Sequence, residues 1–274
     1  MGSPGVRRVA ISPATRTDVG KRRSRNEDVV ATDPSIGLYA VFDGMGGENA
    51  GDVAAKLAAD EVVAYVLDRW RSAPPTRPGS PWWMPYLSAS EQEVHRSRLL
   101  QDAIRAANKR VHEEAAKRRE HKRMGTTAVV ALVSPGGSVT IAHVGDSRAY
   151  LIRAGRLRRL TTDHTIVGQL VKNGKISEEE AKRNPWRHML LSSVGTHPEV
   201  DTIDVLQVGL EGGDRLMLCS DGVNGEVEDA QIERILRLGS SADAASGLIR
   251  AALGAGGRDN ASVVVLDVVA MGHQ

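Results

Sequence analysis

The sequence is short of cysteine, of aromatic residues and of any large excess of charge. A single cysteine, Cys219, among 274 residues excludes a disulfide framework and fits a reducing compartment. Aromatic residues make up 3% of the chain, so a hydrophobic core has to rest on Val, Leu, Ile and Ala. A net charge of +2 gives no bulk electrostatic argument for binding to nucleic acid.

Long hydrophobic runs are missing as well. No stretch reaches 18 consecutive apolar residues, so we expect no membrane span, and the N-terminus lacks the apolar segment of a signal peptide. The hydrophobic fraction of 41% is still that of a globular protein, and the length suffices for one large domain or two small ones. We expect a cytoplasmic monomer.

Aspartates stand at the ends of several predicted strands. The apolar run 36–42 predicts a buried strand, and Asp43 follows it. Glycines come next, and they let the backbone turn sharply and approach a ligand closely. The same arrangement recurs at Asp146 after the run 141–144, at Asp221 after the run 216–219 and at Asp259 before the run 261–266.

Four aspartates at strand ends can converge on one site. Converging carboxylates repel one another unless a cation neutralises them, and hard oxygen ligands suit Mg²⁺ or Mn²⁺. A single Asp-Gly pair after a strand, however, is most often only a turn. The order and the residue identities of the whole set of motifs decide between a metal site and simple turns.

That set runs through most of the chain in a fixed order. Its members are Arg23-x-x-Asn26-Glu27-Asp28, Asp43-Gly44-Met45-Gly46-Gly47, Gly125-Thr126-Thr127, Val144-Gly145-Asp146-Ser147-Arg148, Ser220-Asp221-Gly222 and Arg258-Asp259-Asn260. In this order the motifs resemble the metal-dependent serine/threonine protein phosphatases of type 2C, the PPM family, over about residues 15–269. Methionine at position 45 resembles the bacterial branch of that family.

The resemblance implies a single phosphatase domain over residues 1–274 with an α+β fold. This fold is an α/β/β/α sandwich of two antiparallel sheets flanked by helices, with metals at one edge. A flap segment, about 160–199, lies beside the active site. The proline-rich connection 72–90, which contains Trp82 and Trp83, is an insertion about which the resemblance says least. It is either a loop packed by its own aromatic residues or a docking surface for a partner.

The resemblance also implies two tightly bound metal ions, Mn²⁺ or Mg²⁺. Asp43 then bridges both metals, and the carbonyl of Gly44 binds the second. Asp221 and Asp259 hold the first metal. Asp146, together with Asp221, resembles the position of a third, weaker metal.

Further residues of the motifs have implied roles around the metals. Arg23 lies four residues before Glu27, the family spacing of a phosphate-binding arginine, and its guanidinium can bind phosphate oxygens in pairs. Glu27 and Asp28 would lie behind the metals and hold coordinated waters. Eukaryotic members have histidine where Met45 stands, and that histidine resembles a general acid for the leaving group, a role closed to methionine.

The implied function is hydrolysis of phosphoserine and phosphothreonine in proteins by a metal-activated bridging water. The implied partners are phosphorylated proteins, among them a bacterial serine/threonine kinase and its targets, and neither nucleic acid nor a membrane. The alternative is a catalytically weak relative that acts as a binding or regulatory module, although such relatives lose metal carboxylates that are all present here. A Cys-x5-Arg phosphatase is excluded, because Gly225 stands six residues after Cys219.

His143 and His164 are candidate catalysts or ligands, but isolated histidines are more often structural. The basic run 117–123 is expected to be a solvated face.

Periodicity predicts the remaining helices and strands. Helices are expected at 51–70, 99–119, 229–238 and 242–253, with short ones at 167–171 and 178–182. Strands are expected at 36–42, 127–133, 138–144, 147–152, 200–206, 214–219 and 261–268.

Overall fold

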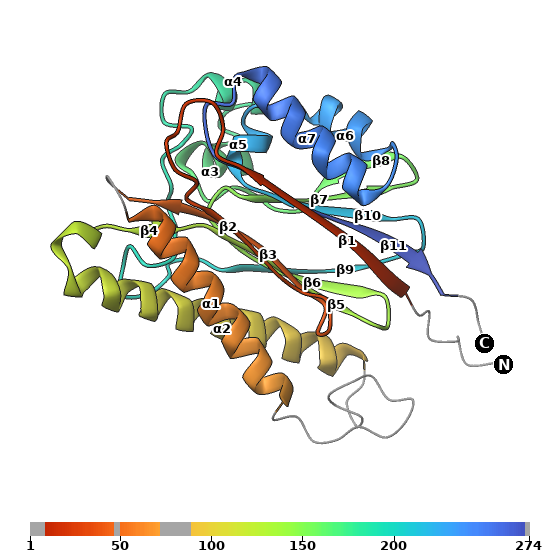
Figure 1. The fold of residues 1–274 in the computed structure, drawn as a ribbon, viewed down its shortest axis with the longest axis horizontal. Helices are drawn as coiled ribbons and strands as arrows, with labels where there is room; N and C mark the ends of the chain where they lie inside the picture. The colour runs from red at the N-terminus through yellow and green to blue at the C-terminus, as the bar shows by residue number, and fades with distance from the viewer. Residues whose placement is uncertain (1–8, 47–49, 72–88, 272–274) are drawn as a thin grey trace.

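A computed structural model describes residues 9–46, 50–71 and 89–271 of the chain. Two antiparallel sheets lie face to face, with helices on the outer side of each (Figure 1). The first sheet has the order β1 (Val9–Asp18), β11 (Ala261–Ala270), β10 (Arg215–Cys219), β7 (Arg148–Arg153) and β8 (Arg156–Arg159). The second has the order β2 (Asp28–Asp33), β3 (Leu38–Met45), β5 (Ala128–Ser134), β6 (Ser138–Val144) and β9 (Asp204–Gly209), and the short β4 (Gly125–Thr126) pairs with β3.

Helices α1 (Gly51–Arg71) and α2 (Ala89–Lys117) cover the second sheet, and α6 (Asp229–Leu236) and α7 (Ser241–Ala255) cover the first (Figure 1). The apolar stripes that predicted these helices are the faces that they bury. On α1 the buried positions include Ala54, Ala58, Val62 and Val66, and on α2 they include Leu100, Ala103, Ile104, Ala107 and Val111.

The core consists of three apolar layers: one between the sheets and one under each pair of helices. Val, Leu, Ile and Ala supply nearly all of it, as the shortage of aromatic residues predicts. Tyr39, Tyr150 and Phe42 are the largest side chains that are fully buried. Since burial of one Val, Leu or Ile side chain stabilises a fold by about 1.5–3 kcal/mol, many small contributions replace a few aromatic ones.

Several expected boundaries were wrong, and three strands besides the two-residue β4 were not predicted. The second helix begins at Ala89 rather than at position 99, and the strand expected at 200–206 is β9, at 204–209. The missed strands are β1, β2 and β8. All three lie at the edge of a sheet, where one side of the backbone has no neighbouring strand, and β1 contains Pro13, which an edge strand tolerates. Of the predicted insertion 72–90, all but the last two residues lie outside the described part of the chain.

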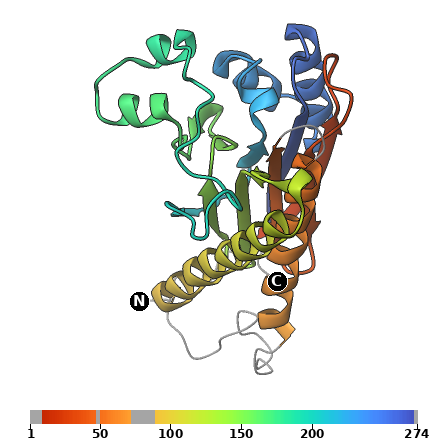
Figure 2. The same cartoon turned by 90° about the vertical axis from the view of Figure 1, so that its left-hand side faces the viewer.

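The segment between β8 and β9 projects away from the sheets (Figure 2). It carries α3 (Ile166–Lys172), which Thr165 caps, and α4 (Glu178–Arg183), which begins with a capping box at Ser177 and Glu180. Both short helices were predicted. No described helix is long and apolar enough to cross a membrane.

Candidate functional site

Asp43 lies near the end of β3, and the Gly125-Thr126-Thr127 motif holds its backbone. The Asp43 N–H donates to Thr127 Oγ1 at 3.0 Å. Its carbonyl oxygen accepts from the Thr127 N–H and from Thr126 Oγ1, both at 2.9 Å. Three hydrogen bonds therefore fix the direction in which the Asp43 carboxylate leaves the strand, a role of the two threonines that the motif alone did not reveal.

Gly44 occupies a position that no other residue can take. A Cβ there would lie 2.1 Å from the carbonyl oxygen of Gly51 and 2.6 Å from that of Glu27. The Gly44 N–H also donates to the Glu27 carbonyl at 3.1 Å. The start of α1 and the loop before β2 thus close around this glycine, as a close backbone approach requires.

Asn260 ties the N-terminal loop to the start of β11. Its side-chain oxygen accepts from the Glu27 N–H at 2.8 Å, and its side-chain nitrogen donates to the carbonyls of Val19 and Arg25 at 2.9 and 2.8 Å. Beside it, Arg23 Nη2 lies 2.7 Å from Asp259 Oδ2 in an ion pair that is partly exposed. The expected phosphate-binding arginine is therefore brought to an expected metal ligand.

Asp28 is 7% exposed and accepts a hydrogen bond from Ser220 Oγ at 2.7 Å. Its other carboxylate oxygen is buried and has no partner among the described residues. Burial raises the pKa of Asp28 to about 7, against the Ser220 hydrogen bond that lowers it. Ser220 also accepts from the Ser262 N–H at 3.0 Å, so this serine links the two sheets at the site.

Asp43, Asp146 and Asp221 act on one another electrostatically. Burial raises the pKa of each, and neighbouring carboxylates raise it further: Asp28 and Asp221 at Asp43, Asp221 at Asp146, and Asp259 at Asp221. Asp43 lies near the end of β3, Asp146 in the turn between β6 and β7, and Asp221 at the start of α5 (Asp221–Asn224). Asp259 lies just before β11, so the four aspartates come from both sheets. The structure therefore brings together the four aspartates that the sequence placed at strand ends.

The arrangement fits a divalent cation. A cluster of partly buried carboxylates with raised pKa values and an unpartnered oxygen on Asp28 is short of positive charge. The donors are all oxygen, which is the preference of Mg²⁺ and Mn²⁺. Glu27, whose pKa is also raised by burial, lies beside the start of α1 at Gly51.

Comparison with known proteins places the chain in a family. The family model described as "Protein phosphatase 2C" matches residues 19–169. The serine/threonine phosphatase stp of Listeria innocua is 35% identical over 259 residues, which are 92% of this chain and 94% of that protein. This chain belongs to the protein phosphatase 2C family.

Other relatives and solved structures agree with this membership. PstP of Mycobacterium tuberculosis is 35% identical over 256 residues, 93% of this chain and 45% of that longer protein. A crystal structure of M. tuberculosis PstP/Ppp superposes with a TM-score of 0.79 at 34% identity and covers 94% of this chain and 99% of its own. A structure of the PstP catalytic domain in complex with two manganese ions gives 0.76 at 33% identity, covering 95% and 99%. The expected sandwich fold and bacterial branch are thereby confirmed.

Cys219 has the environment of a core residue in this phosphatase 2C chain. It is fully buried on β10, and burial raises the pKa of its thiol to about 12. A thiol of that kind is neither ionised nor accessible, so the geometry supports the exclusion of a cysteine nucleophile.

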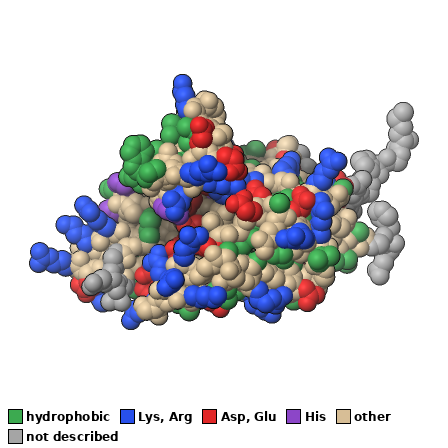
Figure 3. Space-filling model, turned by 90° about the horizontal axis from the view of Figure 1, so that it is seen from above, with side chains coloured by type: hydrophobic (Ala, Val, Ile, Leu, Met, Phe, Trp, Pro, Cys, Tyr) green, Lys and Arg blue, Asp and Glu red, His purple; other side chains and the backbone are tan. Residues whose placement is uncertain are grey.

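The flap brings a histidine to the neighbourhood of the carboxylates, and it exposes several apolar side chains. His188 Nδ1 lies 3.8 Å from Asp221 Oδ2, a proximity that the sequence motifs did not indicate. Trp186, Met189 and Leu191 are each about half exposed. On the face in Figure 3, hydrophobic side chains gather at one end beside histidine, whereas Lys and Arg side chains lie among Asp and Glu.

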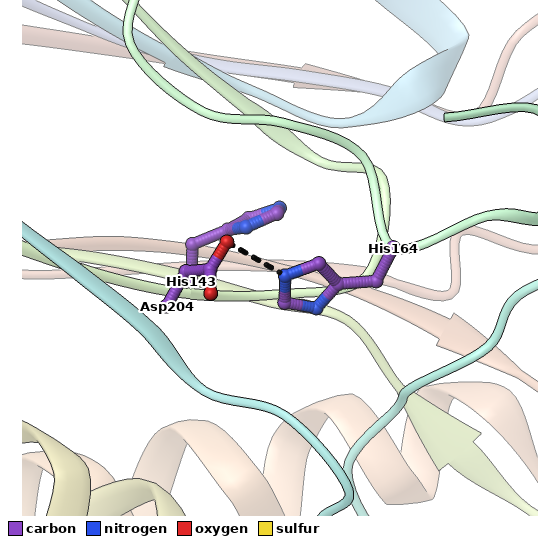
Figure 4. A group of neighbouring side chains, drawn as sticks. All are labelled: His143, His164 and Asp204. Atoms are coloured by element: carbon purple, nitrogen blue, oxygen red, sulfur yellow. Dashed lines mark ion pairs between the residues drawn. The ribbon is translucent and has the colours of Figure 1, made fainter. Parts of the chain in front are cut away.

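The sequence suggested that His143 and His164 are isolated histidines, but in the structure they are neighbours. Their ring centroids are 4.6 Å apart, and Asp204 completes a group of three (Figure 4). Two of the three residues belong to neighbouring strands, β6 and β9. The pairing of these strands could not be predicted from spacing, because β7, β8 and the flap separate them in sequence.

Proposed function

We propose that this chain hydrolyses phosphoserine and phosphothreonine in proteins in a metal-dependent reaction. The observation that carries the proposal is the convergence of Asp43, Asp146 and Asp221 at the junction of the two sheets, where burial and at least one neighbouring carboxylate raise the pKa of each. Membership of the protein phosphatase 2C family supports the same reaction. A binding module without catalysis would not need to keep a set of mutually repelling, buried carboxylates.

The aspartates are assigned to the metals by their places in the motifs. Asp43 would hold both of two Mn²⁺ or Mg²⁺ ions, the Gly44 carbonyl would bind the second, and Asp221 and Asp259 would bind the first. Asp146, with Asp221, would bind a third and weaker ion. When bound, the metals supply a water of lowered pKa as the nucleophile and neutralise the phosphoryl oxygens.

Arg23 is assigned to the substrate phosphate. Its side chain is half exposed, and one of its terminal nitrogens holds Asp259, which leaves its other donors available to phosphate oxygens. Glu27 and Asp28 hold waters behind the metals, for which the unpartnered oxygen of Asp28 is available. Asn260 and Ser220 keep these residues in place by hydrogen bonds.

The physiological partners that we propose are phosphorylated proteins, including a serine/threonine kinase of the same cell and its targets. We further propose a single domain that works as a cytoplasmic monomer. The composition of the chain supports this proposal: one buried cysteine, a near-neutral charge and no long apolar run. The exposed apolar side chains of the flap, which flank His188 in the sequence, are available to contact the protein part of a substrate.

The proposal is tested with the purified chain and a phosphothreonine peptide. We expect phosphate release with Mn²⁺ or Mg²⁺, none after EDTA, and none with Asp43→Asn, because a lost charge there weakens both metal sites. The matched control is Asp33→Asn, which changes a surface aspartate at the end of β2 opposite to Asp28. This variant should keep the activity. Full activity in metal-free buffer, or in Asp43→Asn, would refute the two-metal reaction.

A further inference from the structure

Two histidines and an aspartate form a second group of metal-ligating side chains, and this one contains nitrogen. The group consists of His143, His164 and Asp204, with one ligand atom from each and all of these atoms within 4.8 Å of one another (Figure 4). It shares no member with the carboxylate cluster of Asp43, Asp146, Asp221 and Asp259.

The fold itself places these three side chains together. His143 on β6 pairs directly with Asp204 on β9, so both side chains leave the same face of the sheet. His164 lies just after β8, where the flap begins, and its Nε2 lies 3.2 Å from Asp204 Oδ2. Three separate parts of the chain thus supply one ligand each.

The group is incomplete without a further atom. His143 is fully buried, and neither of its ring nitrogens has a hydrogen-bond partner among the described residues. Nε2 of His164, which is 9% exposed, lacks a well-directed partner in the same part of the chain. A buried polar atom without a partner costs roughly 1–3 kcal/mol, so the unpartnered nitrogens of His143, within 4.8 Å of ligand atoms of His164 and Asp204, point to a missing ligand.

We propose that His143, His164 and Asp204 form a zinc site, distinct from the oxygen-lined centre. Two imidazoles and one carboxylate are a ligand set that Zn²⁺ accepts in tetrahedral geometry, with the fourth position left to water. Nitrogen ligands favour Zn²⁺ over Mg²⁺, whereas the carboxylate centre offers oxygen alone. The Asp204 side chain is 41% exposed, which leaves an opening for the ion and for that water.

The ligands must close slightly around the ion. With bonds of about 2.0–2.1 Å, tetrahedral ligand atoms lie roughly 3.3 Å apart, so the widest pair must approach. Asp204 is the member free to move, because it alone is substantially exposed. His143 needs no change of charge: burial lowers its pKa to about 3, which keeps it in the neutral form that binds a metal.

Occupation of the site would reach the carboxylate centre through His164. In the structure the backbone N–H of Gly145 donates to the ring nitrogen Nδ1 of His164 at 3.3 Å, and the backbone N–H of His164 donates to the Gly145 carbonyl at 2.8 Å. Zinc bound to Nε2 of His164 requires the ring proton to be on Nδ1. The Gly145 N–H would then face the Nδ1–H instead of an acceptor, so this hydrogen bond is lost. Gly145 precedes Asp146, so zinc binding displaces the segment that carries one of the carboxylates.

The test is zinc binding by the full chain with Mg²⁺ in large excess, so that Mg²⁺ occupies the carboxylate centre. After one equivalent of Zn²⁺ and gel filtration, we expect about one zinc per chain, with imidazole scattering in its X-ray absorption spectrum. His164→Asn and Asp204→Asn should lower zinc affinity on the order of 100-fold or more, since even an outer partner of a metal site is worth 10–100-fold.

The matched control is His188→Asn, which removes an exposed histidine beside Asp221 and outside the group, and it should keep its zinc. Asp204→Asn changes a half-exposed side chain and should fold, as a thermal melt can verify, so that the test does not depend on substituting buried His143. Zinc retention unchanged in Asp204→Asn and His164→Asn would overturn the proposal. So would a wild-type spectrum without imidazole scattering, or zinc that only Asp43→Asn removes.

Discussion

Asp28 on β2 lies directly opposite Asp43 on β3, so two carboxylates leave neighbouring strands side by side. Like charges opposite one another destabilise a sheet, and here Asp28 raises the pKa of Asp43 beyond the effect of burial. The Ser220 hydroxyl donates a hydrogen bond to only one carboxylate oxygen of Asp28, and the other has no partner among the described residues. The fold thus keeps a pair that opposes its own stability, and a bound cation would offset the repulsion.

Asp28→Asn should stabilise the metal-free protein at neutral and alkaline pH. The pKa of Asp28 is about 7 in the folded protein and near the ordinary value of 3.8 when unfolded. The unfolded chain therefore loses this proton first, and wild-type stability falls as pH rises through that window, on the order of a few kcal/mol. Asparagine does not titrate and still accepts from Ser220.

Thermal melts in EDTA from pH 5 to 8 check this prediction. The variant should melt above the wild type at pH 8, and the difference should shrink toward pH 5. Mn²⁺ should raise the melting temperature of the wild type more than that of the variant, because the wild type has more repulsion to relieve. A variant that melts below the wild type at pH 8 would contradict the account.

Asn260→Ala should lower both stability and activity. It removes the acceptor for the Glu27 N–H and the donors to the Val19 and Arg25 carbonyls, each a contact worth about 1 kcal/mol. The loop that carries Arg23 is then released from β11. We expect kcat/KM on a phosphopeptide to fall roughly 10- to 100-fold, since a displacement of about 1 Å can cost that much.

A surface asparagine serves as the control for this variant. Asn173→Ala at the end of α3 removes a side chain whose described contact, with Gln169, is exposed and 3.4 Å long. It should leave kcat/KM and the melting temperature nearly unchanged. Equal effects of the two substitutions would show that Asn260 does not act through the loop.

The difference between Asp43 and Asn260 shows what the sequence could predict. An aspartate after an apolar run is visible in the sequence, because strand pattern and turn chemistry are local. The hydrogen bonds of Asn260 join residues more than 230 positions apart, and Ser220 meets Asp28 across 192 positions. The pairing of His143 with Asp204 depends on strand order and register, which periodicity does not specify. Edge strands such as β1 were missed because their burial does not alternate.

Cys219→Ser should leave catalysis intact. The thiol is buried among apolar side chains, and burial raises its pKa to about 12, so it contributes packing and no nucleophile. The buried hydroxyl should cost about 1–3 kcal/mol of stability. The measurements are kcat with saturating Mn²⁺ and the melting temperature. A tenfold loss of kcat in a variant that remains folded would argue against the metal-activated water.

Met45→His tests how the leaving group is protonated. Met45 lies two residues beyond Asp43 at the end of β3, opposite Gly125. Methionine cannot donate a proton, whereas a general acid helps most when the leaving group is basic, as a serine alkoxide is and p-nitrophenolate is not. If the imidazole reaches the leaving oxygen, kcat on a phosphoserine peptide should rise by up to about 100-fold, and kcat on p-nitrophenyl phosphate should change little.

The decisive quantity for Met45→His is the ratio of kcat on the two substrates, measured from pH 6 to 9. Met45→Leu is the matched control, because it keeps an apolar side chain of similar volume and should leave the ratio unchanged. An imidazole misplaced by about 1 Å at position 45 would lose most of the gain. A ratio unaltered by histidine, with both metals still bound, would mean that position 45 does not face the leaving group or that a metal-bound water already protonates it.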